Sequence, residues 1–213
     1  AVWGFVNAVA QKVAVEAPGC YLKCCSYADY TRRPDFPLMP NVAVTLCYGT
    51  VPHGSLHYKK NWRTHIEEWL PTGAKLYFWE YWNNARAGRG TYGAPSFFQR
   101  QLREIYLLDR NQISGRVIEL CDINSEGKGI NSWADWMYDV RNLYTAARLM
   151  WDPDRDVEAE LAEFYPAFYG SAAKLLEEFY DQLELAWTRS CILEAKQKVW
   201  DWEVCWKETY PPE

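Results

Sequence analysis

The sequence predicts an α/β protein in which parallel strands alternate with helices. Two observations lead to this prediction. Four short runs of apolar, β-prone residues are separated by segments of helical periodicity, and equivalent points of the runs are roughly 20 to 40 residues apart, as in βα units. No run is followed by a glycine-rich phosphate loop, so an open nucleotide-binding sheet is disfavoured. The four runs are 21–27, 42–48, 76–82 and 116–122.

We therefore prefer a (β/α)₈ (TIM-like) barrel to an open sheet. A barrel of this kind has eight strands and about 250 residues. The chain has 213 residues, and we find only four strands. We predict that residues 1–153 form the second half of such a barrel, beginning with the helix after its fourth strand. Residues 154–213 are predicted to be a helical extension that packs on the barrel.

Proline and glycine mark the ends of the elements in the first part of the chain. Apolar residues at helical spacing predict a helix over 5–17, which Pro18-Gly19 ends. Three prolines in the loop over 29–40 exclude a regular helix between the first two strands. A second helix, through Trp62 and Ile66, closes before the third strand at Pro71 and Gly73.

The later part of the chain is predicted to be mostly helical. A helix over about 96–111 leads to the fourth strand, and further helices cover 133–150, 157–169 and 171 to about 206. Asp154 or Asp156 is expected to cap the start of the helix over 157–169, and Gly170 its end.

Composition limits the possible functions. Hydrophobic residues make up 49% of the chain against 24% charged, which excludes wholesale disorder. The net charge of −5 leaves no basic face for nucleic acid, and no run of eighteen apolar residues could span a membrane. Twelve Trp and fifteen Tyr exceed what a core of this size needs. Such rings beside Asn, Asp and Glu suit stacking on sugars, although aromatic residues also fill cores.

The pattern of Cys and His residues argues against a metal or redox centre. The seven cysteines contain no C-x-x-C pair, and the three histidines have no helical pairing with a carboxylate. We expect no cofactor. The first residues have no signal-peptide pattern, which indicates a mature product or a fragment. We expect an extracellular or periplasmic location.

Two glutamates near the carboxyl ends of predicted strands are the candidate catalytic groups. Glu80 is a lone carboxylate among aromatic residues at the end of an apolar strand, and it is costly to bury unless paired or used. Glu119 has the same place on the next strand, so both could face one pocket beyond the carboxyl ends. Alternatively, each is a structural carboxylate held by a neighbouring Arg or Tyr. The predicted substrate-binding residues are Tyr27, His57, Trp79, Tyr81, Asn84 and Asp122.

Several short motifs, in order over about residues 3–180, resemble a domain family long described as uncharacterised. The motifs are Phe5-Val6-Asn7, Ala17-Pro18, Tyr27, Tyr30-Thr31-Arg32-Arg33-Pro34, Leu46-Cys47, the His57 region, Leu76-Tyr77-Phe78-Trp79-Glu80-Tyr81, Leu149-Met150-Trp151-Asp152-Pro153 and Phe168-Tyr169-Gly170. The resemblance implies barrel glycoside hydrolases, including bacterial endo-β-N-acetylglucosaminidases, with distant similarity to hexosaminidases and α-glucuronidases.

The resemblance implies a glycan substrate and a missing part of the active site. Relatives of this barrel type carry acid/base residues at the end of the fourth strand, which would lie upstream of Ala1. The expected partners are therefore an oligosaccharide and the N-terminal half of the barrel or another subunit. Glu80 stands where the family pattern has Asp, and Ile118-Glu119-Leu120-Cys121 lacks the usual aromatic residue and Gln, which indicates a different sugar. The alternative function is a non-catalytic glycan-binding or structural subunit.

Overall fold

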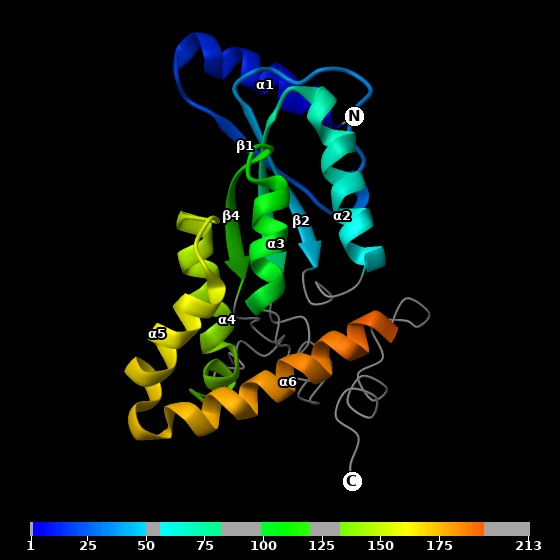
Figure 1. Ribbon diagram of the computed structural model, residues 1–213. Coiled ribbons are helices and arrows are strands. Elements are labelled where there is room, and N and C mark those ends of the chain that lie inside the picture. The colour runs from blue at the N-terminus through cyan, green and yellow to red at the C-terminus, as the bar shows by residue number, and fades with distance from the viewer. Residues whose placement is uncertain (1, 50–55, 82–98, 120–132, 194–213) are drawn as a thin grey trace. The chain divides into compact units, whose positions relative to one another are not determined.

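The computed structural model of the chain describes residues 2–49, 56–81, 99–119 and 133–193 (Figure 1). The chain divides into two compact units. The sheet unit comprises Ala1–Gly49, Lys60–Tyr81 and Asp109–Glu119, and the helical unit comprises Thr50–Lys59, Trp82–Leu108 and Leu120–Glu213. Strands alternate with helices in the first part of the chain and helices follow, so the predicted α/β class is confirmed.

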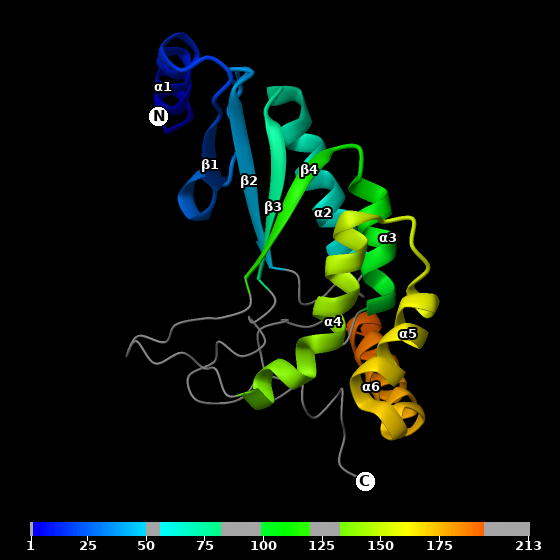
Figure 2. The same ribbon diagram turned by 90° about the vertical axis from the view of Figure 1, so that its left-hand side faces the viewer.

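The sheet unit contains four parallel strands that lie side by side in the order of the sequence (Figure 2). Each strand is an apolar, β-prone run of the predicted kind. The strands are β1 (Leu22–Ser26), β2 (Val42–Gly49), β3 (Lys75–Tyr81) and β4 (Ile113–Glu119).

Strand β4 begins at Ile113, three residues before the predicted start at Arg116. The sequence Ser114-Gly115 resembles a turn, but here it continues the strand through an irregularity in the pairing with β3. The predicted end at Asp122 lies outside the described residues.

One face of the sheet packs against helix α2 (Leu56–Trp69). Side chains of alternate residues lie on this face, because successive residues of a strand point to opposite sides. Phe78, at 1% exposure, stacks on Trp62 of α2 with ring centroids 4.1 Å apart. Helix α1 (Val2–Glu16) contacts the end of α2, where Trp3 meets Trp69 edge to face at 5.0 Å. These aromatic contacts are part of the core of the sheet unit, together with fully buried aliphatic residues of the strands such as Val44 and Leu46.

The connection from β1 to β2 has no α-helix. It consists of the short 3₁₀ helix η1 (Ala28–Tyr30) and an irregular segment, as its prolines predict. Asn7 of α1 fixes this segment, since its side-chain amide donates to the Pro37 carbonyl (3.0 Å) and accepts from the Met39 backbone N–H (2.8 Å). The segment is thus held against α1.

The helical unit contains four α-helices in its described part, joined by arginine-carboxylate contacts. Arg100 pairs with Glu158 (2.6 Å), with Asp181 (3.1 Å) and with Glu184. Asp156 caps α5, accepting from the backbone N–H groups of residues 158 and 159, so the predicted choice between two caps is resolved. The helices are α3 (Gln99–Asp109), α4 (Trp133–Trp151), α5 (Val157–Tyr169) and α6 (Ala173–Leu193), with the 3₁₀ helix η4 (Gly170–Ala172) before α6.

The last described helix, α6, ends at Leu193. The predicted continuation of the last helix to about residue 206 lies outside the described residues, which end at Leu193. Among the helices that the structure describes, none is both long and apolar enough to cross a bilayer.

Candidate functional site

Glu80 is buried at the carboxyl end of β3 and pairs with an arginine. Its side chain is 0% exposed and forms an ion pair with Arg116 of β4, whose side chain is 6% exposed. The Arg116 guanidinium lies 5.2 Å from the centre of the Phe78 ring and 5.6 Å from that of Trp62. Glu80 therefore lies on the face of the sheet that packs against α2. This contact agrees with the alternative that Glu80 is a structural carboxylate held by a neighbouring Arg.

Tyr77 and Trp79 of β3 lie on the opposite face, because they alternate with Phe78 and Glu80. Both side chains are partly exposed. The strand register places Trp79 between Cys47 of β2 and Val117 of β4. This face thus carries Tyr77 at the middle of the sheet and Trp79 toward its carboxyl end.

The ring of Tyr77 lies against the backbone of β4 at Gly115. A methyl group built on Gly115 would come within 3.2 Å of two Tyr77 ring carbons, which is tighter than an ordinary van der Waals contact. The Lys23 ammonium lies 6.0 Å from the Tyr77 ring centre. An aromatic ring that covers a glycine of a neighbouring strand is a known way to stabilise a sheet. The absence of a side chain at Gly115 therefore lets Tyr77 lie across the sheet.

The two predicted catalytic glutamates are one residue out of register with each other on the neighbouring strands β3 and β4. Glu80 pairs in register with Ile118, whereas Glu119 pairs with Tyr81. The structure therefore does not bring Glu80 and Glu119 to one register position. Position 119 instead pairs with Tyr81, which alternates along β3 with Glu80 as Trp79 does.

The predicted substrate-binding residues are only partly described. Tyr27 follows β1 at its carboxyl end and is 49% exposed, and Trp79 lies on the face described above. His57 is in α2 and Tyr81 ends β3. The side chains of His57, Tyr81 and Glu119 lie outside the described residues, as do Asn84 and Asp122 entirely.

The described cysteines do not form a metal or redox centre. Within the part of the chain that the structure describes, no three His, Cys, Asp or Glu side chains gather as a metal site would require. Cys20, Cys24 and Cys25 are free thiols. Burial, with a smaller effect of the neighbouring Cys25, raises the pKa of the Cys24 thiol, which makes Cys24 a poor nucleophile at neutral pH.

Sequence reasoning missed Tyr77 and Arg116. Strict alternation along β3 separates Tyr77 and Trp79 from Phe78 and Glu80, and this signal is present in the sequence. The pairing of Arg116 with Glu80 has no such signal, because the two residues are 36 positions apart and meet only once the register of β3 and β4 is set.

The fold and this face define an α/β domain of parallel strands with partly exposed aromatic residues opposite a helix. A comparison with family models identifies the family. The model "Domain of unknown function (DUF4838)" matches residues 1–181, and the chain belongs to this family. No curated protein and no solved structure matches the chain. The description of the family names no activity, so the resemblance to glycoside hydrolases stays a prediction.

Proposed function

We propose that this chain is part of a glycoside hydrolase that acts on glycans containing N-acetylhexosamine. Part of the active site would come from a segment outside the described residues. The observation that carries the proposal is the pair Tyr77 and Trp79 on one face of a parallel sheet, with Trp79 toward the carboxyl end of β3. Ligands of parallel α/β folds bind beyond these ends, and aromatic rings stack on sugars.

Glu119 is the better candidate for acid/base chemistry. Glycoside hydrolysis needs a proton donor on one side of the anomeric carbon and, on the other, a second carboxylate or the acetamide of the substrate. Position 119 pairs in register with Tyr81, and the residue two positions before it, Val117, pairs with Trp79. We therefore assign the proton-donor role to Glu119 in this proposal.

Glu80 has a positioning role in this proposal. It is completely buried, is engaged by Arg116, and lies on the face that packs against α2. The ion pair links the carboxyl end of β3 to the middle of β4. It would thereby hold Trp79 of β3 and position 119 of β4 in a fixed relation.

Turnover of an aryl N-acetylhexosaminide by the full-length protein tests the proposal. We expect Glu119→Gln to lower kcat/KM by more than about a hundredfold, because general acid catalysis contributes about 10²- to 10⁴-fold. The melting temperature should not change. Asp122→Asn is the matched comparison, because Asp122 is assigned only to binding and its loss should mainly raise KM. Unchanged turnover in Glu119→Gln would remove this residue from the mechanism.

A non-catalytic glycan-binding or structural subunit is the second candidate. The observation that favours it is a set of large exposed apolar side chains in the helical unit, which suit contacts with another protein. These side chains are Trp151 (90% exposed), Leu175 (71%), Phe168 (52%) and Phe179 (52%). Glycan binding by a full-length protein that turns over no hexosaminide would favour this candidate.

A further inference from the structure

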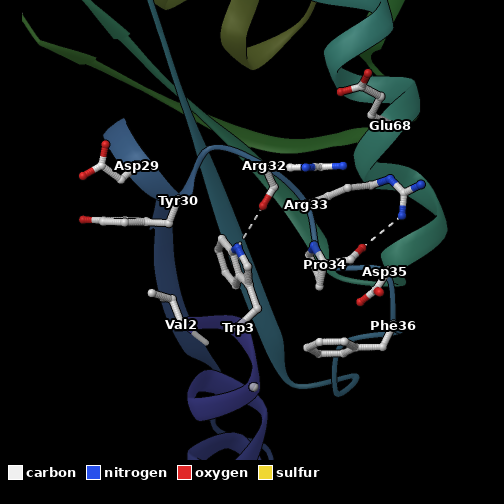
Figure 3. Close-up of a pocket in the computed structure, with 11 residues that line it drawn as sticks. Val2, Trp3, Asp29, Tyr30, Arg32, Arg33, Pro34, Asp35, Phe36 and Glu68 are labelled. Carbon is white, nitrogen blue, oxygen red and sulfur yellow. Dashed lines mark hydrogen bonds between the residues drawn. The ribbon is translucent and has the colours of Figure 1, made fainter.

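A cavity in the sheet unit lies apart from the face that carries Trp79. Its volume is about 780 Å³, within the range of small-molecule sites, which is about 300 to 1,000 Å³. The start of α1, the segment between β1 and β2, and Glu68 of α2 line it (Figure 3). Because α2 packs on the Phe78 face, Glu68 reaches the cavity from the helix side of the sheet.

The apolar part of the cavity is aromatic. Trp3 is 6% exposed, and its indole N–H donates to the Arg32 carbonyl (3.1 Å). This hydrogen bond fixes the ring and satisfies its polar atom. Tyr30 and Phe36 are each 39% exposed, and Figure 3 shows their rings on either side of Trp3. Tyr30 and Phe36 offer flat apolar surface with access from solvent, and Trp3 backs them from the core.

The polar part of the cavity carries both signs of charge. Two arginines, Arg32 and Arg33, and three carboxylates, those of Asp29, Asp35 and Glu68, line it. The Arg33 guanidinium donates to the Pro34 carbonyl (2.9 Å), which orients it (Figure 3). Within the described part of the chain, the structure records no ion pair between these arginines and carboxylates.

This combination favours a neutral ligand with many hydroxyl groups. Three carboxylates disfavour a phosphate or another multivalent anion, and two guanidinium groups disfavour a multivalent cation. A hydroxyl group can donate to a carboxylate and also accept from a guanidinium, so both kinds of side chain can bind the same ligand. The C–H faces of a sugar ring can pack on Tyr30 or Phe36.

We infer that this cavity binds a saccharide unit of the glycan that the proposed function assigns to the protein, at a distance from the bond that is cleaved. The inference rests on the proposed function for the kind of sugar. It assigns the cavity to binding and gives it no part in the chemistry. Small aryl substrates, which have a single sugar unit, do not need this site.

Binding of a neutral N-acetylglucosamine trisaccharide to the full-length protein, measured by calorimetry, tests the inference. We expect Tyr30→Ala and Arg33→Ala each to raise the Kd of the cavity site about tenfold. Phe5→Ala and Arg63→Ala are matched controls, since both residues are exposed in the same unit and neither lines the cavity. The controls should leave Kd within about twofold, and melting temperatures should confirm that all four variants fold.

Two readouts separate this inference from the proposed function. If the cavity variants bind the trisaccharide as the unaltered protein does, or if no trisaccharide binds, the inference is overturned, whatever the activity. Competition of the trisaccharide by millimolar inorganic phosphate that Arg33→Ala abolishes would also overturn it, because the cavity would then be an anion site. If the variants lose binding but no hexosaminide is ever turned over, the assignment of the cavity to saccharide binding stands and the enzymatic proposal fails.

Discussion

Arg116 of β4 forms a buried ion pair with Glu80 of β3 beneath the rings of Trp62 and Phe78. A buried ion pair adds little net stability, because removing both charges from water costs free energy. Removing only one partner is strongly destabilising, because the other charge is then buried without compensation. The pair therefore specifies how the carboxyl end of β3 packs beside β4.

We predict that Arg116→Ala lowers the free energy of unfolding by about 3 to 5 kcal/mol, because it leaves the buried Glu80 carboxylate without its guanidinium partner. Urea denaturation followed by circular dichroism measures this change. Arg63→Ala, an exposed arginine on α2, is the control and should cost less than about 0.5 kcal/mol.

Replacing both members of the pair should cost less than removing one. We expect Glu80→Leu combined with Arg116→Met to recover most of the stability, since no buried charge is then left without a partner. A double variant as unstable as Arg116→Ala alone would contradict this account of the pair.

We predict that Gly115→Ala moves the Tyr77 ring and lowers stability by about 1 kcal/mol, since an added methyl group would lie 3.2 Å from that ring. The cost should largely disappear in a Tyr77→Ala background, where the ring is absent. A double-mutant cycle of unfolding free energies measures the coupling between the two positions. Equal costs in both backgrounds would show that the ring contact does not limit this position.

Glu160 of α5 makes the stability of the helical unit sensitive to acid. Burial raises the pKa of its carboxyl, but hydrogen bonds from Arg148 and Arg155 outweigh burial and lower the pKa from its ordinary value of 4.5. The stabilisation is therefore present above about pH 4.5 and is lost as pH falls through the lowered pKa of the folded state.

We predict that Glu160→Gln reduces the loss of stability as pH falls below about 4.5, and that it lowers stability at pH 7. Urea denaturation over this pH range measures both effects. Glu163→Gln is the matched control, because Glu163 also contacts Arg148 (3.2 Å) but its side chain is 65% exposed. Parallel pH profiles for Glu160→Gln and the unaltered protein would contradict the prediction.

The sequence predicted most of the fold because its elements are marked locally. Apolar periodicity and the prolines around residues 18, 34 and 71 located α1, α2 and the first three strands within a few residues. The predicted start of β4 was wrong, because Gly115 has the local character of a turn. Only the contact with Tyr77 explains why Gly115 lies in a strand.

The candidate site was less predictable because it depends on register. A single position decides whether a glutamate shares a face with Trp79 or with Phe78, and the pairing of β3 with β4 sets that position. Local sequence cannot give the irregularity at Ser114 and Gly115 in this pairing. The cavity beside Trp3 was missed for a related reason, since its side chains come from separated segments that only the fold brings together.

The most direct test of the central claim is a crystal structure of the full-length Glu119→Gln variant with an intact N-acetylhexosamine oligosaccharide. The account predicts a sugar ring within about 4.5 Å of the Trp79 or Tyr77 ring, on the face opposite α2, with the scissile bond near position 119. An oligosaccharide bound elsewhere, with this face of the sheet covered by protein, would contradict it.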